Sequence, residues 1–319
     1  MNRLSKRERT TFWMVFALVT LILLGAGFWV VSFVYGRVEV AQEPDPNLSP
    51  FFVNYSVDNT QFLQDTSLIA MGNWIRDVPE TQNVQVLTGL TTSEVAGYMV
   101  NQVANGLQVD CSYCHNIQDF SQDDMEDTLV AERKATARAH LLMSQDLNQN
   151  WLAQLPTLTD LKQPSGAQVT CATCHKGQAL FNTWADQPNA LPDDYRLPLG
   201  NLDILLVNGN KDISLDTVQY NQYTMYHMNE SMNVGCTHCH NSRYFPSNER
   251  PSKLYALHML QMAEYIQANY SDVINAQDPS CSMCHNGAII PGGAAKSVAD
   301  LPAIISTDPT GGAVSQAQQ

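Results

Sequence analysis

The sequence predicts a mainly α-helical protein in which four helix–CxxCH units are joined by long irregular loops and preceded by one N-terminal transmembrane helix. Three observations support this prediction. An apolar run lies near the N-terminus, the motif CxxCH occurs four times, and an amphipathic helix pattern stands ahead of each motif. The third observation predicts helices, because the apolar residues recur at helical spacing and helix-start residues precede them.

Residues 10–36 form an apolar run that contains no charged residue. About 20 apolar residues suffice to span a bilayer. The basic residues ahead of the run are Arg3, Lys6, Arg7 and Arg9, opposed by Glu8 alone. This bias keeps the N-terminus in the cytoplasm. A cleaved signal peptide is the alternative, but its apolar part is only about 7–15 residues long. We therefore expect a retained single-pass anchor in the cell membrane.

Every cysteine belongs to a CxxCH motif. The cysteines are Cys111, Cys114, Cys171, Cys174, Cys236, Cys239, Cys281 and Cys284, and the histidines that follow each pair are His115, His175, His240 and His285. This motif is the attachment signature of c-type haem, in which both thiols bond to the porphyrin and the imidazole binds the iron as proximal ligand. Zinc sites are the alternative, but they need paired CxxC motifs at shorter separations and do not require a histidine after each one. The sequence predicts four covalently attached haem c groups.

The chain divides into five predicted segments. A basic cytoplasmic N-terminus (1–9) and the transmembrane anchor (10–36) are followed by a Pro-rich linker (37–50). The tetrahaem cytochrome domain covers 51–290, and a flexible C-terminal tail rich in Gly, Ala, Ser and Gln covers 291–319. Covalent haem attachment takes place outside the cytoplasm, so the haem domain is expected to be periplasmic.

Each unit is predicted to begin with a helix. The helix-start signals are a capping box at Thr91–Glu94 and the residues Asp127, Asp216 and Ser252. When the four helices are aligned, one register holds Met99, His140, Met225 and Met259. A c-type haem iron needs a sixth ligand unless it binds a substrate, and methionine or histidine is usual. We expect these four side chains to be the distal iron ligands.

Three alternatives remain open for the distal ligands. Met143 lies one helical turn beyond His140 and would bind the second haem in its place. His140 would otherwise reach the fourth haem. His258, next to Met259, competes with it for the fourth haem.

The charge balance bears on partners. The chain has 17 Lys+Arg and 31 Asp+Glu, a net charge of −14, and five of the basic residues lie at or before Arg37. Nucleic acid is therefore excluded as a partner. A soluble partner with a basic docking surface fits this charge, because charge complementarity speeds encounter.

Several phrases of the sequence resemble the tetrahaem cytochrome subunit of photosynthetic reaction centres, among them VLTGLTTSEV, VTCATCHKG and NVGCTHCHNSRYF. The resemblance covers roughly residues 50–290. It implies an electron carrier, not an enzyme, that sits on the reaction-centre L and M subunits and re-reduces the bacteriochlorophyll special pair. It also implies that the haem of Cys236, Cys239, His240 and Met225 lies closest to that pair.

Two features depart from this family's usual pattern. Many members are lipoproteins, whereas this chain keeps a hydrophobic anchor as in filamentous anoxygenic phototrophs. That implies a blue-copper protein or a small cytochrome c as soluble donor, and light-harvesting antenna helices as a further candidate partner. In purple-bacterial members a histidine shortly before the second motif binds the fourth haem, and here Gln154 stands at its place. We therefore expect the bis-histidine haem to be the second one.

Two other classes of protein share some of these sequence features. A membrane-anchored tetrahaem quinol dehydrogenase, or another periplasmic electron carrier, has the same anchor and haem count but relies mostly on bis-histidine ligation. The eight histidines here are too few for that. A haem enzyme commonly carries an altered proximal motif or a fifth haem, and the sequence has neither.

Overall fold

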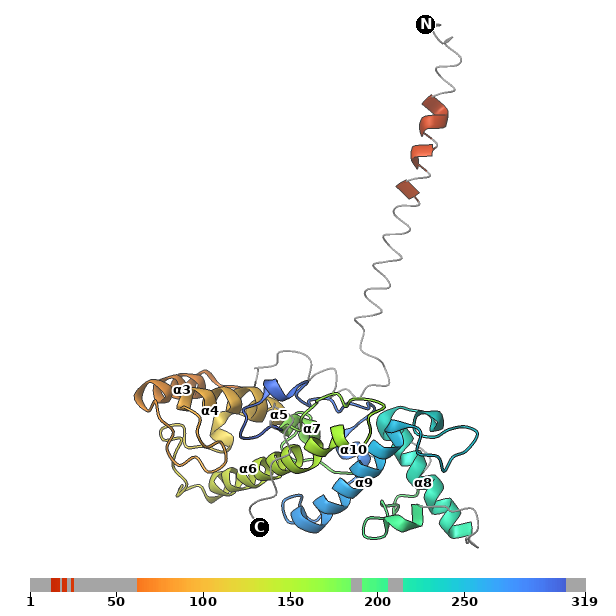
Figure 1. Cartoon of the computed structure of the whole chain (residues 1–319). Coiled ribbons are helices and arrows are strands. Elements are labelled where there is room, and N and C mark those ends of the chain that lie inside the picture. The colour runs from red at the N-terminus through yellow and green to blue at the C-terminus, as the bar shows by residue number, and fades with distance from the viewer. Residues whose placement is uncertain are drawn as a thin grey trace. The chain divides into compact units, whose positions relative to one another are not determined.

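The computed structural model divides the chain by its backbone contacts into two compact units, Met1–Asn47 and Leu48–Gln319. The second unit, called the body below, carries all four CxxCH motifs (Figure 1). The structure describes residues 13–17, 19–21, 24–25, 62–184, 191–205 and 215–307.

Most of the predicted anchor at 10–36 lies outside the described residues. Its described residues, at 13–17, 19–21 and 24–25, are helical and exposed. Among the helices that the structure describes, none is both long and apolar enough to cross a membrane. The anchor therefore stays a prediction.

The described part of the body is helical, and its residues form isolated β-bridges but no strand. The α-helices are α3 (Asp65–Asp77), α4 (Thr92–Tyr98), α5 (Asn105–Leu107), α6 (Thr128–Asp146), α7 (Cys171–His175), α8 (Leu215–Met232), α9 (Pro251–Tyr270) and α10 (Cys281–Cys284). The other helical turns are the π turns Met99–Ala104 and Leu147–Trp151 and the 3-10 helices Cys111–Tyr113, Leu152–Thr157, Leu202–Leu205, Cys236–His238 and Val298–Asp300. The predicted mainly α fold is confirmed.

Helix starts follow the expected local signals at Thr91 and Asp127, whereas Asp216 and Ser252 are already helical. The Thr91 hydroxyl accepts from the Glu94 amide, and the Glu94 carboxylate accepts from the Thr91 amide, which completes the predicted capping box. Asp127 caps α6 by accepting from the Leu129 amide. Helix α9 starts two residues earlier than predicted, because Pro251 occupies its first turn and Ser252 is already helical. Proline suits this place, since its missing N–H has no partner there anyway.

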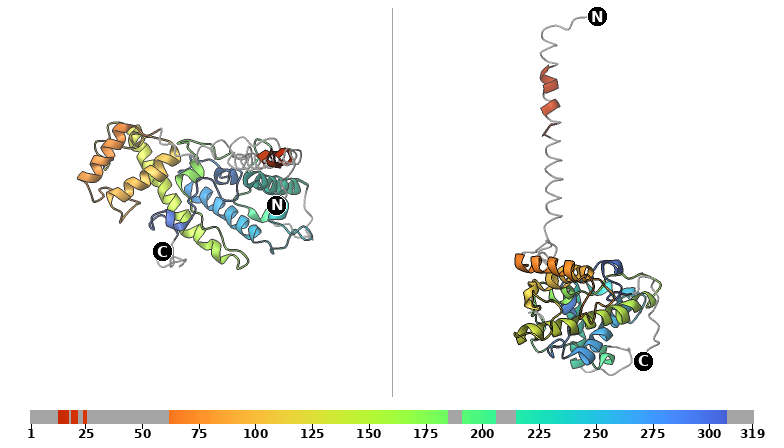
Figure 2. Two further views of the ribbon diagram at one scale, coloured as in Figure 1. Left: turned by 90° about the horizontal axis from the view of Figure 1, so that it is seen from above. Right: turned by 90° about the vertical axis from the view of Figure 1, so that its left-hand side faces the viewer.

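Three hydrophobic clusters follow one another through the body and are linked by two helices. Helix α6 contributes Leu141 to one cluster and Met143 to the next. Helix α9 contributes Ile266 to that second cluster and Leu260 to the third. Figures 1 and 2 show α4 and α8 toward opposite ends of the body, with α6 and α9 between them.

Part of the segment expected to be a flexible tail, 291–319, is packed into the body. Leu301 and Ile305 are 6% and 0% exposed and belong to the hydrophobic cluster that includes Leu141. The buried side chain of Asn148 donates to the Ile305 carbonyl at 3.0 Å. The expectation was wrong for 291–307, because the Gly- and Ala-rich composition concealed a few apolar residues that fill the core. Residues 308–319 lie outside the described part.

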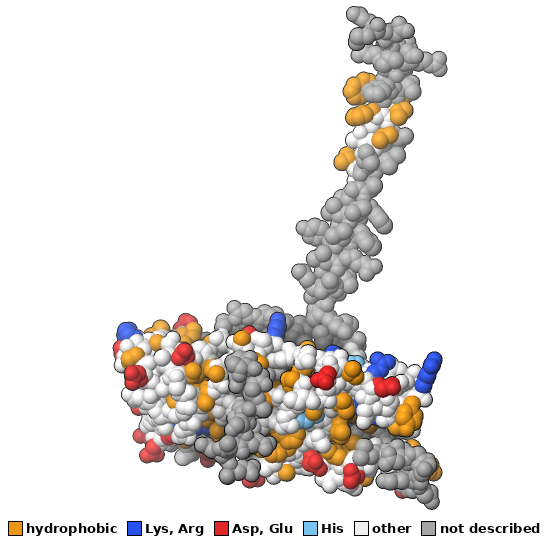
Figure 3. Space-filling model, in the orientation of Figure 1, with side chains coloured by type: hydrophobic (Ala, Val, Ile, Leu, Met, Phe, Trp, Pro, Cys, Tyr) orange, Lys and Arg blue, Asp and Glu red, His pale blue; other side chains and the backbone are white. Residues whose placement is uncertain are grey.

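Acidic side chains are spread along the face of the body shown in Figure 3 and do not gather into one patch there. On this face, therefore, the acidic side chains do not mark a docking surface for a basic partner.

Candidate haem sites

In all four motifs the histidine ring is held by a backbone carbonyl a few residues further along. The Nδ1···O distances are 3.2 Å for His115 and Phe120, 2.9 Å for His175 and Gln178, 2.9 Å for His240 and Phe245, and 3.0 Å for His285 and Ala288. A carbonyl only accepts, so Nδ1 carries the proton and Nε2 keeps its lone pair for a metal. Metal-bound histidines are oriented by such bonds. All four rings fit the role of proximal iron ligand.

The first and third motifs share one local structure. Each pair of cysteines opens a short 3-10 helix, Cys111–Tyr113 or Cys236–His238. An aromatic ring five residues after the histidine then packs beside it, with centroids 5.4 Å apart for Phe120 and 4.9 Å apart for Phe245. The same backbone supplies the carbonyl that holds the histidine.

The second and fourth motifs share another structure, a short α-helix that ends in a left-handed pair. The pair is Lys176 and Gly177 with φ of 51° and 83°, or Asn286 and Gly287 with φ of 32° and 88°. The turn brings the glycine amide onto the helix of the preceding unit: Gly177 donates to the Gly106 carbonyl at 2.8 Å. Gly287 donates in the same way to Ser231 at 2.6 Å.

These equivalences pair the first motif with the third and the second with the fourth, which divides the body into two halves of two motifs each. Gly106 and Ser231, the carbonyl acceptors, both lie five residues before the first cysteine of the next motif. Met99 lies 12 residues before its cysteine and Met225 only 11. The π turn Met99–Ala104 accommodates the extra residue, whereas α8 runs without one. Met99 and Met225 can therefore hold equivalent positions.

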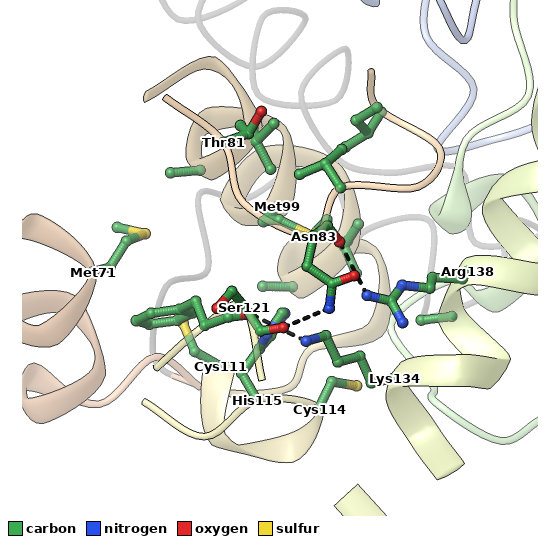
Figure 4. Close-up of a pocket in the computed structure, with 18 of the residues that line it drawn as sticks. Met71, Thr81, Asn83, Met99, Cys111, Cys114, His115, Ser121, Lys134 and Arg138 are labelled. Atoms are coloured by element: carbon green, nitrogen blue, oxygen red, sulfur yellow. Dashed lines mark hydrogen bonds between the residues drawn. The ribbon is translucent and has the colours of Figure 1, made fainter. Parts of the chain in front are cut away.

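The first motif opens into an apolar cavity. The cavity has an empty volume of about 1240 Å³, its open mouth included, and Met99, Cys111, Cys114 and His115 line it. Figure 4 shows Met99 on one side of this space and the three motif residues on the other. The residues present fit a haem with His115 and Met99 as its two axial ligands.

Burial keeps several motif thiols uncharged. It raises the pKa of Cys114 to about 11 and the pKa values of Cys171 and Cys281 to about 12. Zinc binding and thiol redox chemistry need thiolates. A thioether sulfur carries no charge, so these surroundings suit covalent attachment to a porphyrin.

His140 faces the free nitrogen of His175. Its Nδ1 lies 3.2 Å from His175 Nε2, and its Nε2 lies 2.8 Å from the Val273 carbonyl, to which it donates. In each ring the proton is on the other nitrogen, which donates to a carbonyl oxygen. Both facing nitrogens therefore carry lone pairs. Burial, with His140 close by, lowers the pKa of His175 to about 4. Two lone pairs that face each other favour a metal cation between them. Two metal–nitrogen bonds in line need about 4 Å, so the rings would have to separate from 3.2 Å to take an iron between them.

Met143, the alternative to His140, is turned elsewhere. It is 5% exposed and packs in the hydrophobic cluster with Leu147 and Ile266. Its sulfur therefore serves the core of the body in this arrangement.

In the fourth unit Met259 lines one cavity together with Cys281, Cys284 and His285. His258, the alternative ligand, is buried, and its Nε2 lies 3.0 Å from the Trp151 carbonyl oxygen. The geometry favours Met259 over His258 as distal ligand.

The third motif is the most exposed. Cys236 is exposed, and beyond the motif Tyr244 and Phe245 are 63% and 52% exposed. Met225 packs beside the cluster of Met228 and Leu260. Its assignment to this motif therefore rests on its register in α8.

The motifs follow one another in the spatial order first, second, fourth, third. The Gly177–Gly106 bond joins the second motif to the helix that precedes the first. Cys174 Sγ lies 3.4 Å from Cys284 Sγ, which places the second and fourth motifs in contact. Cys239 lines the same cavity as Cys284, so the third motif follows the fourth. Figure 1 shows α7 and α10 side by side in the middle of the body.

Two lysines hold the loops after the first and third motifs, a role that the sequence did not indicate for either of them. Lys134 Nζ donates to the carbonyls of Phe120 and Gln122, and Lys253 Nζ donates to those of Phe245, Pro246 and Ser247. Each lysine lies six residues before a distal-ligand position, His140 or Met259. That shared spacing was the signal that could have revealed them.

The helical body and its four histidine–cysteine sites define the class of a c-type cytochrome. The family model described as "Photosynthetic reaction centre cytochrome C subunit" matches residues 55–194 and 205–305. The chain belongs to this family, which confirms the resemblance seen in the sequence.

Curated relatives agree with the family match. The chain is 28% identical over 230 residues to "Cytochrome c-554" of Chloroflexus aurantiacus, an alignment that covers 55% of this chain and 52% of that protein. It is 25% identical over 272 residues to the "Photosynthetic reaction center cytochrome c subunit" of Thermochromatium tepidum, covering 71% and 64%. The subunit of Roseobacter denitrificans is also 25% identical, over 284 residues, covering 71% and 73%. The chain thus spans about half to two thirds of the first two relatives.

Proposed function

We propose that this chain is the electron-transfer subunit of a photosynthetic reaction centre and performs no bond-making chemistry. It carries electrons from a soluble periplasmic donor to the photo-oxidised bacteriochlorophyll special pair. Four covalent haem c groups supply the one-electron couple. The observation that carries the proposal is the fourfold arrangement in which a carbonyl holds Nδ1 of a histidine and leaves Nε2 free beside two cysteines.

The axial ligands are proposed from the same geometry. The four CxxCH histidines bind the iron on one side, and the distal ligands are Met99, His140, Met225 and Met259. The second haem is then the only bis-histidine haem and has the lowest potential of the four, because imidazole stabilises ferric iron better than a thioether does. The lone pairs of His140 and His175 that face each other support this assignment.

The partners and location follow from the family and the sequence. The L and M subunits are the proposed seat of the body, and the donor is a blue-copper protein or a small cytochrome c. Residues 10–36 are proposed as a single-pass anchor with the N-terminus in the cytoplasm. Antenna helices are proposed as further neighbours of this anchor in the membrane. The exposed aromatic side chains after the third motif suit a protein contact at that end of the body.

Two measurements test the main proposal. A pyridine haemochrome assay on the purified chain should give four haems per polypeptide, and flash excitation of native membranes should oxidise a haem of this chain. A ratio of two or three, or membranes that show no light-induced haem oxidation, would contradict it. Mass spectrometry of the mature N-terminus tests the prediction of a retained anchor. A mature chain that begins beyond residue 30 would contradict that prediction.

His140→Met tests the ligand assignment. It should raise one midpoint potential and replace a bis-histidine EPR signal with a His/Met signal. Met143→Leu is the matched control on the same helix and should leave all four potentials in place. If Met143→Leu moves a potential and His140→Met does not, Met143 is the ligand.

A further inference from the structure

The first motif has a buried ammonium behind its histidine. The Phe120 carbonyl that accepts from His115 Nδ1 also accepts from Lys134 Nζ, at 3.2 and 3.1 Å. The Lys134 side chain is only 8% exposed. The positive charge is thus one hydrogen-bonded carbonyl away from the ring that faces the iron site (Figure 4).

The third motif repeats this arrangement. The Phe245 carbonyl accepts from His240 Nδ1 at 2.9 Å and from Lys253 Nζ at 3.2 Å. The two lysines share this hydrogen-bond pattern but differ in burial, since Lys134 is buried and Lys253 is half-buried.

The two sites differ in the residue that faces the lysine. At the first motif Asp123 Oδ1 lies 2.9 Å from Lys134 Nζ, and Asp123 Oδ2 accepts from Arg138 at 2.9 Å. The residue at the same distance from the third motif, 12 positions after its first cysteine, is Asn248. Within the part of the chain that the structure describes, Lys253 has no ion-pair partner.

A positive charge near a haem iron favours the ferrous state, which carries one positive charge less than the ferric state. A carboxylate paired with that charge offsets the effect. Hydrogen bonds from Arg138, and from Asn83 and Lys134, lower the pKa of Asp123 well below its ordinary value, so the carboxylate is ionised at neutral pH. One carboxylate faces both Lys134 and Arg138, so it offsets part of their combined positive charge.

We propose that Asp123 lowers the reduction potential of the first haem, and that Asn248 leaves Lys253 uncompensated and so raises the potential of the third. The inference rests on the proposed function in one respect, the attachment of haem at both motifs. Each of the two residues is assigned an effect on the haem of its own motif. Arg138, which also pairs with Asp123, adds a second positive charge at the first motif and contributes to the difference between the two sites. Asp123 and Asn248 act through the lysines and the carbonyls and are positioning residues.

The test exchanges the two residues. Asp123→Asn should raise one midpoint potential, and Asn248→Asp should lower a different one. Asp123 is 40% exposed and is screened by solvent, so we expect a three- to tenfold change in each reduction equilibrium. For a one-electron couple this is about 28–59 mV. Both shifts should shrink at high salt, because mobile ions screen partly exposed charges.

Asp124→Asn is the matched control. It removes the same charge one position along the chain, from an exposed side chain that makes no ion pair with Lys134. It should move the potential of the first haem by less than half as much. Equal shifts for Asp123→Asn and Asp124→Asn would overturn the proposal, as would shifts of the same sign for the two exchange variants.

Failure of the proposed function gives a different result. The haemochrome assay is run first on the wild type and each variant, and a wild-type chain without covalent haem contradicts the function itself. Four haems with an unchanged absorption spectrum and unmoved potentials contradict only the role of Asp123 and Asn248. The variants Lys253→Arg, which keeps the charge, and Lys253→Met, which removes it, supply a second measurement: only Lys253→Met should lower the potential of the third haem.

Discussion

Gly106→Ala should destabilise the body at the contact between its first two motifs. A Cβ atom at this position would lie 2.9 Å from the Ala172 amide nitrogen and 3.0 Å from Cys171 Cβ. Comfortable carbon contacts are about 3.5–4.0 Å. The Ala172 atom belongs to the backbone of α7, so it cannot rotate away, and α5 would have to move back from α7.

Three contributions set the size of the effect. Overpacking of this kind costs about 1–3 kcal/mol. The movement also weakens the Gly177–Gly106 hydrogen bond of 2.8 Å, and such a bond contributes about 0.5–1.5 kcal/mol. Alanine returns about 0.5–1 kcal/mol as the better helix former. The net loss is about 2 kcal/mol, which lowers Tm by about 4–8 °C in a domain of this size.

The assay is thermal unfolding of the haem-loaded protein followed by far-UV circular dichroism. Gly97→Ala is the matched control, because Gly97 lies in α4 and a Cβ there meets nothing within 4 Å. It should raise the stability by about 0.5–1 kcal/mol. If Gly106→Ala is as stable as Gly97→Ala, α5 and α7 are not in the contact described, and the spatial order of the motifs loses its first link.

Three further predictions concern stability. Burial raises the pKa of Asp110, but hydrogen bonds from Gln64, Ser67 and Ser112 outweigh it and hold the pKa at about 2, below the ordinary 3.8. Its contribution is therefore present above about pH 4 and is lost as the pH falls toward 2; Asp110→Asn should cost about 1–2 kcal/mol at pH 7 and flatten the acid-unfolding curve. Asn148→Ala leaves the buried Val169 and Ile305 carbonyls without a donor and should cost about 2–3 kcal/mol in urea unfolding, whereas exposed Asn150→Ala should stay within about 0.5 kcal/mol. Truncation after Ile290 should lower Tm, since it removes the buried Leu301 and Ile305, whereas truncation after Thr307 should not.

Local patterns were enough to predict the parts of this molecule that are determined locally. The capping box at Thr91, the start of α6 at Asp127 and the four cysteine pairs all follow from short stretches of sequence. The register of His140 also proved informative, since the structure brings its ring onto His175. What the sequence did not reveal depends on contacts between distant segments. The burial of Ile305 needs Asn148, which lies 157 residues away.

Helices α6 and α9 explain how the chain holds four sites in a fixed order. Helix α6 reaches back through Lys134 to the loop after the first motif and forward through His140 to the second. The two residues are six positions apart, which is about 9 Å along the helix at 1.5 Å per residue. Helix α9 does the same for the third and fourth motifs with Lys253 and Met259.

The helix of each half thus fixes the spacing between its two motifs, and the contact between the halves only has to join the second motif to the fourth. The Cys174–Cys284 contact and the bonds from Lys176 Nζ to the Ser282 and Met283 carbonyls, both 2.9 Å, provide that joint. Joining two halves at these inner motifs leaves the first and third at opposite ends. This arrangement suits the proposed electron carrier, because a donor and an acceptor can then approach different ends of the series.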